Sequence, residues 1–331
     1  MTRVAVMGAG SWGTAFAQIL CDAGNDVTIW ARRAELAAAI NRQHRNLDYF
    51  PSVELPEGLV AVTDPDEAMA GADFVVLAVP SQTLRASLYA WSVPSDAVVV
   101  SLAKGIEQGT GLRMSQVIAQ TGGIAPERIA VVSGPNLSRE IIERQPSASV
   151  VASVSAATAD ALQAICHTPT FRPYTNTDVV GIELSGATKN VIALAVGMGI
   201  GIGLGDNASA SVITRGLAET TRLGLVLGAD PYTFSGLAGL GDLVATCSSP
   251  LSRNRTFGAE LGRGRSVAEI TASTRQVAEG VKSCASIQAL ADEHQVEMPI
   301  VEHVAEVIAG ELSPTDMIKA LMSRSAKPER Y

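Results

Sequence analysis

The stretch Arg3-Val-Ala-Val-Met-Gly-Ala-Gly-Ser-Trp-Gly13 is an apolar strand pattern that leads into a G-x-G-x-x-G turn, and an apolar helical pattern follows over residues 15–20. Gly8, Gly10 and Gly13 let the backbone turn sharply and approach a pyrophosphate, while the free N–H groups at the helix start attract the anion. The motif alone is weak evidence, but its place between a strand and a helix is informative. We therefore predict a dinucleotide cofactor at this turn; the alternative is an ordinary glycine-rich turn.

Composition predicts a globular protein of two domains. Of the 331 residues, 47% are hydrophobic and 18% are charged, which suits a large core and excludes a disordered chain. The net charge of −8 argues against a nucleic-acid partner. The N-terminus is strand-like from its second residue, so we expect no signal peptide. The most apolar stretch, Val191–Leu204, contains four glycines, and we expect a buried helix and loop there rather than a membrane span.

The cysteines and histidines indicate neither disulfides nor a metal site. The four cysteines lie far apart and form no CxxC pair, which is typical of reduced, mostly buried thiols in a cytoplasmic protein. The four histidines show no metal-ligand spacing, so no metal is predicted.

The first half of the chain alternates apolar strand patterns with helical ones, which is typical of a doubly wound α/β sheet of the Rossmann type. The predicted strands are Arg3–Met7, Asp26–Ala31, Leu59–Val62, Phe74–Val79, Ala97–Ser101, Ile129–Ser133, Ser147–Ser153 and Phe171–Thr175. Several are continuous apolar runs, as expected for parallel strands buried on both faces. The polar segment Arg45–Gly58 is predicted to be a surface insertion.

Strand patterns largely end near Asp178, and helical periodicity replaces them. The predicted helices are Asp178–Met198, Ser209–Leu227, Val277–His294, Ile300–Ala309 and Ser313–Met322. We therefore expect a dinucleotide-binding domain over residues 1–178, an all-helical domain over 179–325 and a frayed tail over 326–331.

The end of the second predicted strand indicates which nicotinamide cofactor binds. Many NAD-specific folds place an acid there to bind the ribose hydroxyls. This chain has Arg32 and Arg33 instead, and a guanidinium suits a 2′-phosphate by charge and by its planar donors. The sequence thus predicts NADPH, with NADH also accepted; the alternative is a solvated arginine pair at a helix start.

Seven motifs occur in order along the chain. They are GAGSWG (8–13), SLAKG (101–105), SGPN (133–136), ELSGATKN (183–190), GLGDL (239–243), SRNR (252–255) and VAEG (277–280). Over almost its whole length the chain resembles bacterial NAD(P)-dependent sn-glycerol-3-phosphate dehydrogenase. The resemblance implies reduction of dihydroxyacetone phosphate to sn-glycerol 3-phosphate by NADPH or NADH, a role in phospholipid synthesis and, as a further expectation, a cytoplasmic homodimer without stable membrane insertion.

The resemblance implies that Lys189 is the catalytic acid/base. Lys189 follows the small residues Ser185, Gly186 and Ala187 on an apolar helix, where a lysine is rarely found without a partner. Reduction of a ketone needs a proton donor, and a partly desolvated lysine near other cations has a pKa closer to the working pH. The alternative is a lysine at the rim of a helix interface.

The resemblance also implies the ligand contacts. The substrate would be bound by Lys104, Gly134, Asn136, Lys189, Asp242, Ser252, Arg253 and Asn254. The segment Arg253–Arg265 supports an anion site, because it holds four arginines and one acid, Glu260; a solvated basic helix would look the same. Asp242 would hold Lys189 or a substrate hydroxyl, or it would only begin a helix or turn.

The cofactor would be bound by Gly8, Gly10, Ser11, Trp12, Gly13, Arg32, Arg33, Lys104, Ser138, Arg253, Val277 and Glu279. Trp12 could equally pack between the domains, and Glu279 could be a helix-start acid. Asn136 and Ser138 depart from the family pattern, which has a Ser or Thr and then a small apolar residue at these places. The hydroxyl contact expected at Asn136 is therefore in doubt.

Two other functions remain open on the sequence. One is a different Rossmann enzyme with a helical second half, such as a ketopantoate reductase, a β-hydroxyacid dehydrogenase or a sugar-nucleotide dehydrogenase. The other is a nucleotide sensor without turnover, which the glycine motif alone would permit. The GLGDL and SRNR segments favour a phosphate substrate over the first, and Lys189 with Asp242 and Arg253 argues against the second.

Overall fold

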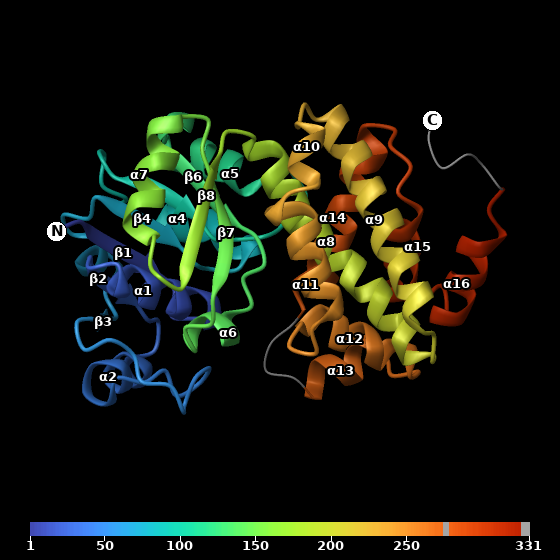
Figure 1. Ribbon diagram of the computed structural model, residues 1–331, viewed down its shortest axis with the longest axis horizontal. Helices are drawn as coiled ribbons and strands as arrows, with labels where there is room; N and C mark the ends of the chain where they lie inside the picture. Colours follow the sequence, from blue (N-terminus) through green and yellow to red (C-terminus); the bar gives the residue numbers. More distant parts are fainter. Residues whose placement is uncertain (274–277, 326–331) are drawn as a thin grey trace.

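The computed structural model describes residues 1–273 and 278–325. Figure 1 shows a sheet with its covering helices beside a bundle made of the later helices. The strands are β1 (Arg3–Met7), β2 (Asp26–Trp30), β3 (Val60–Val62), β4 (Phe74–Leu77), β5 (Val98–Ser101), β6 (Ile129–Ser133), β7 (Ser147–Ala152) and β8 (Phe171–Asn176). The helices are α1 (Ser11–Asp22), α2 (Ala34–Gln43), α3 (Pro65–Met69), α4 (Leu84–Ala90), α5 (Met114–Gly122), α6 (Ser138–Ile142), α7 (Ala156–Cys166), α8 (Val179–Gly201), α9 (Asp206–Val226), α10 (Pro231–Phe234), α11 (Asp242–Ser248), α12 (Arg253–Gly262), α13 (Val267–Ser273), α14 (Glu279–Glu293), α15 (Pro299–Ala309) and α16 (Pro314–Ser323).

The strands form one sheet in the order β3-β2-β1-β4-β5-β6-β7-β8. Side chains alternate between its two faces, and both faces are buried: Val4 and Val6 join the core beneath α1, while Ala5 and Met7 join the core beneath α4 and α5. All eight predicted strands are present, and their ends lie within two residues of the prediction. One pairing is antiparallel, between β6 and β7, and the other pairings are parallel. The predicted fold class, a Rossmann-type sheet followed by a helical domain, is confirmed.

Segment 45–58 is irregular, as predicted, but it is not simply a surface insertion. Asn46, Phe50 and Leu55 are 0%, 3% and 2% exposed. The Asn46 amide donates to the carbonyl of Ala9 (3.0 Å) and to the hydroxyl of Thr14 (2.8 Å). The burial of Asn46, Phe50 and Leu55 was not predicted, because the residues around them in the sequence are mostly polar.

Helix α8 forms the centre of the helical half. Among the described residues it is the one helix long and apolar enough to cross a membrane, and 94% of that stretch is buried inside the protein. It is therefore a core helix, as the glycine-containing run predicted. Glycine permits a close approach to α12, because Cβ atoms at Gly197, Gly201 and Gly258 would overlap backbone carbonyl groups of the other helix.

A buried carboxylate ties the start of α8 to the sheet half. Glu183 accepts hydrogen bonds from the Arg113 guanidinium (2.6 Å), the Ser115 backbone N–H (2.7 Å) and the Ser115 hydroxyl (2.6 Å) at the start of α5. Nearby, Val179 and Ile182 pack on Val131 of β6. These contacts hold the helix that carries Lys189 in a defined place relative to the sheet.

The second half is helical, as predicted, and the five predicted helices correspond to α8, α9, α14, α15 and α16. The sequence did not predict α11 and α12, which carry Asp242 and Arg253. The domain boundary at residue 178 stays a prediction; β8 ends at Asn176 and α8 begins at Val179. The predicted tail at 326–331 lies outside the described residues.

Candidate functional site

The three glycines of the first turn have different surroundings. A Cβ at Gly8, where φ is +137°, would lie 2.6 Å from the carbonyl oxygen of Ala78, and a Cβ at Gly13 would overlap the carbonyl of Gly8. A Cβ at Gly10 would meet no atom within 4 Å. Gly8 and Gly13 are therefore needed for close packing, whereas Gly10 faces open space into which a ligand can come close to the backbone.

The start of α1 fits a dinucleotide pyrophosphate. Gly10 is the N-cap, no side chain of the described residues caps the helix, and its first turn contains no acidic residue. The N–H groups of that turn and the positive end of the helix dipole favour an anion. The open space at Gly10 lies at the same place.

Gly10→Ala and Gly13→Ala should separate ligand binding from packing. The methyl group of Gly10→Ala takes space beside the helix start, so cofactor affinity should fall by roughly ten-fold or more with little change in stability. Gly13→Ala forces a shift of the Gly8 backbone and should destabilise the fold by about 1–3 kcal/mol. Fluorescence titration with NADPH and urea unfolding measure the two effects. Equal loss of affinity in both variants without any loss of stability would contradict this division.

The two arginines after β2 have different partners. Arg32 is exposed and has no ion pair or hydrogen bond with any residue in the described ranges. Arg33 is the N-cap of α2 and forms an ion pair with Asp48 of segment 45–58. The sequence missed Asp48, because nothing in its local pattern indicates a contact with Arg33.

Two lysines share one carboxylate at the junction of the two halves. Lys104 follows β5, Lys189 lies on α8 and Asp242 begins α11 directly after the short π-helix η3 (Leu237–Gly241). The Lys104 ammonium donates to Asp242 Oδ2 (2.5 Å) and to the carbonyl of Gly134 (3.1 Å). The Lys189 ammonium donates to Asp242 Oδ1. Asp242 thus combines two of the alternatives given for it: it begins a helix, and its carboxylate accepts a hydrogen bond from Lys189.

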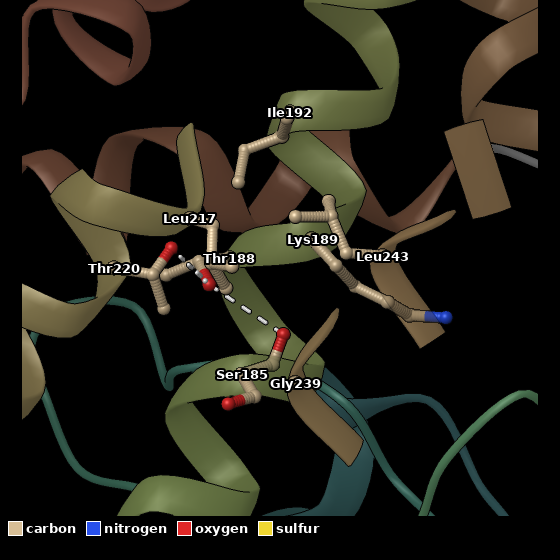
Figure 2. Close-up of a pocket in the computed structure, with 8 residues that line it drawn as sticks. All are labelled: Ser185, Thr188, Lys189, Ile192, Leu217, Thr220, Gly239 and Leu243. Carbon is tan, nitrogen blue, oxygen red and sulfur yellow. Dashed lines mark hydrogen bonds between the residues drawn. The ribbon is translucent and has the colours of Figure 1, made fainter. Parts of the chain in front are cut away.

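Thr246 is a fourth member of this cluster that the sequence did not predict. Its hydroxyl accepts a hydrogen bond from the Lys189 ammonium (2.7 Å) and lies 3.2 Å from Asp242 Oδ1. Thr246 is four residues after Asp242 on α11, so both side chains lie on one helix face. Figure 2 shows the Lys189 side chain extending away from the hydroxyls of Thr188 and Thr220, which hydrogen-bond each other at 3.0 Å. The ammonium is thus held by α11 rather than by its own helix.

The charges of the cluster are strongly coupled. Lys189 and Asp242 are only 9% and 1% exposed. Burial lowers the pKa of Lys104 to about 8, with Lys189 adding to the decrease and Asp242 opposing it. Burial alone would raise the pKa of Asp242, but the charges and hydrogen bonds of Lys104 and Lys189 outweigh it and lower that pKa below its ordinary value. The carboxylate is therefore ionised at neutral pH and holds both lysines.

The loop between β6 and α6 connects this cluster to the glycine turn. At one end the carbonyl of Gly134 accepts from Lys104, and at the other the Ser138 hydroxyl accepts from that of Ser11 (3.5 Å). Between them, both polar side-chain atoms of Asn136 are buried and have no partner among the described residues. A buried amide without hydrogen bonds lowers the stability of the folded protein unless a further partner, such as a ligand, bonds to it.

The start of α12 lies next to α8 and α14. Ser252 is its N-cap, with the hydroxyl accepting from the Arg255 N–H (3.3 Å), and Arg253 is its first residue and is exposed. Asn254 donates to Asn190 Oδ1 (2.9 Å) and accepts from the Gly280 N–H (2.9 Å). Asn254 thus links three helices. Asn190 belongs to the ELSGATKN motif, but its contact with Asn254 was not predicted.

Two further predicted residues, Trp12 and Glu279, lie at the starts of α1 and α14. Trp12 packs edge-on against Phe16, with 5.5 Å between ring centroids, and this contact lies within α1 rather than between the two domains. Glu279 is the first residue of α14; burial raises its pKa, while the charges of Arg253 and nearby lysines oppose the increase. Val277 lies outside the described residues.

Two family models match most of the chain. The N-terminal model of NAD-dependent glycerol-3-phosphate dehydrogenase matches residues 3–159, and the C-terminal model of the same family matches residues 178–319. A glycerol-3-phosphate dehydrogenase (NAD(P)+) from Streptomyces avermitilis is 64% identical over 331 residues, covering 99% of this chain and 98% of that protein.

Solved structures agree with these matches. The glycerol-3-phosphate dehydrogenase of Coxiella burnetii is 35% identical, with a TM-score of 0.93 over 98% of this chain and 99% of that one. A ketopantoate reductase from Ralstonia eutropha is 16% identical, with a TM-score of 0.59 over 96% and 100% of the two chains. At that identity it shares the fold only.

Proposed function

Because this chain belongs to the NAD-dependent glycerol-3-phosphate dehydrogenase family, we propose that its lysine–aspartate cluster performs the proton transfer of that reaction. The enzyme reduces dihydroxyacetone phosphate to sn-glycerol 3-phosphate, reversibly, with NADH or NADPH. The observation that carries the assignment of residues is the buried arrangement of Lys104, Asp242 and Lys189.

Lys189 is the proton donor. The bound cofactor supplies the hydride to C2 of the substrate. The Lys189 ammonium gives a proton to the former carbonyl oxygen, and the positive charges of the cluster stabilise the negative charge that develops there. Asp242 and Thr246 hold the ammonium in place through their hydrogen bonds. In the reverse direction the neutral amine of Lys189 takes the proton from the hydroxyl.

The substrate phosphate lies at the start of α12. Arg253 supplies charge, Ser252 and Asn254 supply polar groups, and the positive end of the dipole of this ten-residue helix lies at the same place. Lys104 supplies a second positive charge, Gly134 holds that lysine, and a ligand contact would satisfy the unpartnered amide of Asn136.

The cofactor lies along the glycine turn and the edge of the sheet. Its contacts are Gly8, Gly10, Ser11, Trp12, Gly13, Arg32, Arg33, Lys104, Ser138, Arg253, Val277 and Glu279. The open space at Gly10 and the uncapped start of α1 support this placement. A domain boundary at residue 178, a homodimer, a cytoplasmic location and a role in phospholipid synthesis complete the proposal.

The pH dependence of substrate use should report Lys104. Its pKa of about 8 means that it loses its charge as the pH rises through 8. The phosphate then loses an attractive cation, so kcat/KM for dihydroxyacetone phosphate should fall above an apparent pKa near 8. Lys104→Arg keeps its charge at high pH and should move this decrease to higher pH. A profile unchanged by Lys104→Arg would exclude Lys104 as its source.

The direct test follows the loss of NADPH absorbance with dihydroxyacetone phosphate as the substrate. Parallel reactions replace NADPH with NADH, or replace dihydroxyacetone phosphate with ketopantoate. Oxidation only with the triose phosphate supports the assignment. Oxidation with ketopantoate instead would favour the carboxylate-reducing enzymes of the same fold. Cofactor binding without oxidation by any substrate would favour the nucleotide sensor.

A further inference from the structure

Asp48 brings a carboxylate to the end of β2, where the local sequence has none. It forms an ion pair with Arg33, the N-cap of α2, three residues beyond the last residue of β2. The Arg33 side chain is 54% exposed and that of Asp48 is 30% exposed, so a ligand can reach both groups. An acid at the end of the second strand is what binds ribose hydroxyls in many NAD-specific folds.

The position of Asp48 is well defined. Its backbone N–H donates to Asn46 Oδ1 (3.3 Å), and the Asn46 amide is anchored on Ala9 in the glycine turn and on Thr14 in α1. Two residues beyond Asp48, the side chain of Phe50 is buried in the core beneath α1. The segment therefore presents its carboxylate between the glycine turn and the end of β2.

We propose that Asp48 sets the balance between the two nicotinamide cofactors. This inference rests on the proposed placement of the cofactor. With NADH, the carboxylate accepts a hydrogen bond from an adenosine ribose hydroxyl. With NADPH, the 2′-phosphate repels the carboxylate and competes with it for Arg33, while Arg32 offers a second guanidinium. Asp48 therefore lowers affinity for NADPH and raises affinity for NADH, so that the chain accepts both.

The test measures binding rather than turnover. Tryptophan fluorescence or calorimetric titration gives dissociation constants for NADPH, NADH, 2′,5′-ADP and 5′-ADP. The variants are Asp48→Asn, Arg33→Ala and the double variant. Glu54→Gln is the matched control, since it removes an exposed negative charge from the same segment.

Asp48→Asn should bind NADPH and 2′,5′-ADP about three- to ten-fold more tightly and NADH about three- to ten-fold more weakly, the range expected for an exposed charge interaction. Adding Arg33→Ala should cancel the gain for NADPH but leave the loss for NADH. Glu54→Gln should leave the ratio unchanged.

Four results would overturn the inference. An unchanged ratio in Asp48→Asn, or an equal shift in Glu54→Gln, would exclude a specific role for Asp48. An equal loss of affinity for both cofactors would mean that Asp48 only maintains the segment. If the unmodified protein bound none of the four probes, the proposed cofactor site itself would be wrong, and that result is distinct from the other three.

Discussion

Lys189→Met should lower kcat for dihydroxyacetone phosphate by about three orders of magnitude, within the range for loss of a general acid. Methionine keeps most of the side-chain volume in this buried position and removes the ammonium that donates the proton, together with its hydrogen bonds to Asp242 and Thr246. Asp242 keeps its ion pair with Lys104, so no buried carboxylate is left without a partner. Stopped-flow measurement of the hydride-transfer step is the appropriate assay.

The control for this variant is Lys319→Met. Lys319 also forms an ion pair with an aspartate, Asp316, but its side chain is 72% exposed on α16. Its replacement should leave kcat unchanged. NADPH affinity of Lys189→Met should stay within about two-fold of the unmodified protein, since the change removes one transition-state interaction. Turnover at the normal rate by a folded Lys189→Met protein would refute the role of Lys189.

The sheet was predictable because its signals are local. Several strands are short apolar runs between polar segments, and the glycine motif lies between a strand and a helix. The antiparallel direction of β7 was not predictable, since a strand that is buried on both faces has the same composition in either direction.

Helix α12 was missed because the face that packs against α8 consists partly of Gly258, Ala259 and Gly262. Glycine usually indicates a loop, but here it allows α12 to pack closely against α8. The apolar periodicity that identifies a helix was therefore weak. The basic character of the segment was visible in the sequence, whereas its secondary structure was not.

No local sequence pattern could predict the cluster of Lys104, Lys189 and Asp242. Asp242 is 138 residues from Lys104 and 53 from Lys189, so only the resemblance to a known family placed the three residues in one site. The spacing of Thr246 could have indicated that it lies beside Asp242, because residues one helical turn apart share a helix face. That signal could not be used while α11 itself was not predicted. Asp48 had no such signal, since its contact with Arg33 depends on the path of an irregular segment.

Asp242→Asn should reduce both activity and stability. The substitution removes the negative charge that two buried lysines share. Breaking a buried ion pair by removing one partner costs about 3–5 kcal/mol of unfolding free energy, because the remaining charge is left uncompensated. Activity should fall as well, since the Lys189 ammonium loses the carboxylate that holds it. Urea unfolding followed by tryptophan fluorescence and steady-state kinetics give the two values.

The pH dependence of this variant separates lost charge from lost packing. Without Asp242, the pKa of Lys104 in the folded state should be depressed further below its unfolded value, because burial is no longer opposed by a negative charge. Between those two pKa values the unfolded chain binds more protons, so stability should rise as the pH increases from 7 to about 10. A deficit that stays constant over this range would indicate a packing defect instead.

Removing one lysine should compensate for Asp242→Asn. In the double variant with Lys104→Met, one buried ammonium remains instead of two, so part of the lost stability should return. Activity should not return, since neither Asp242 nor Lys104 is present. Asp316→Asn is the matched control: its carboxylate is exposed on α16 and pairs with Lys319 at the surface, so stability should be unchanged. If the double variant were less stable than Asp242→Asn alone, repulsion between the two lysines would not be the cause of the instability.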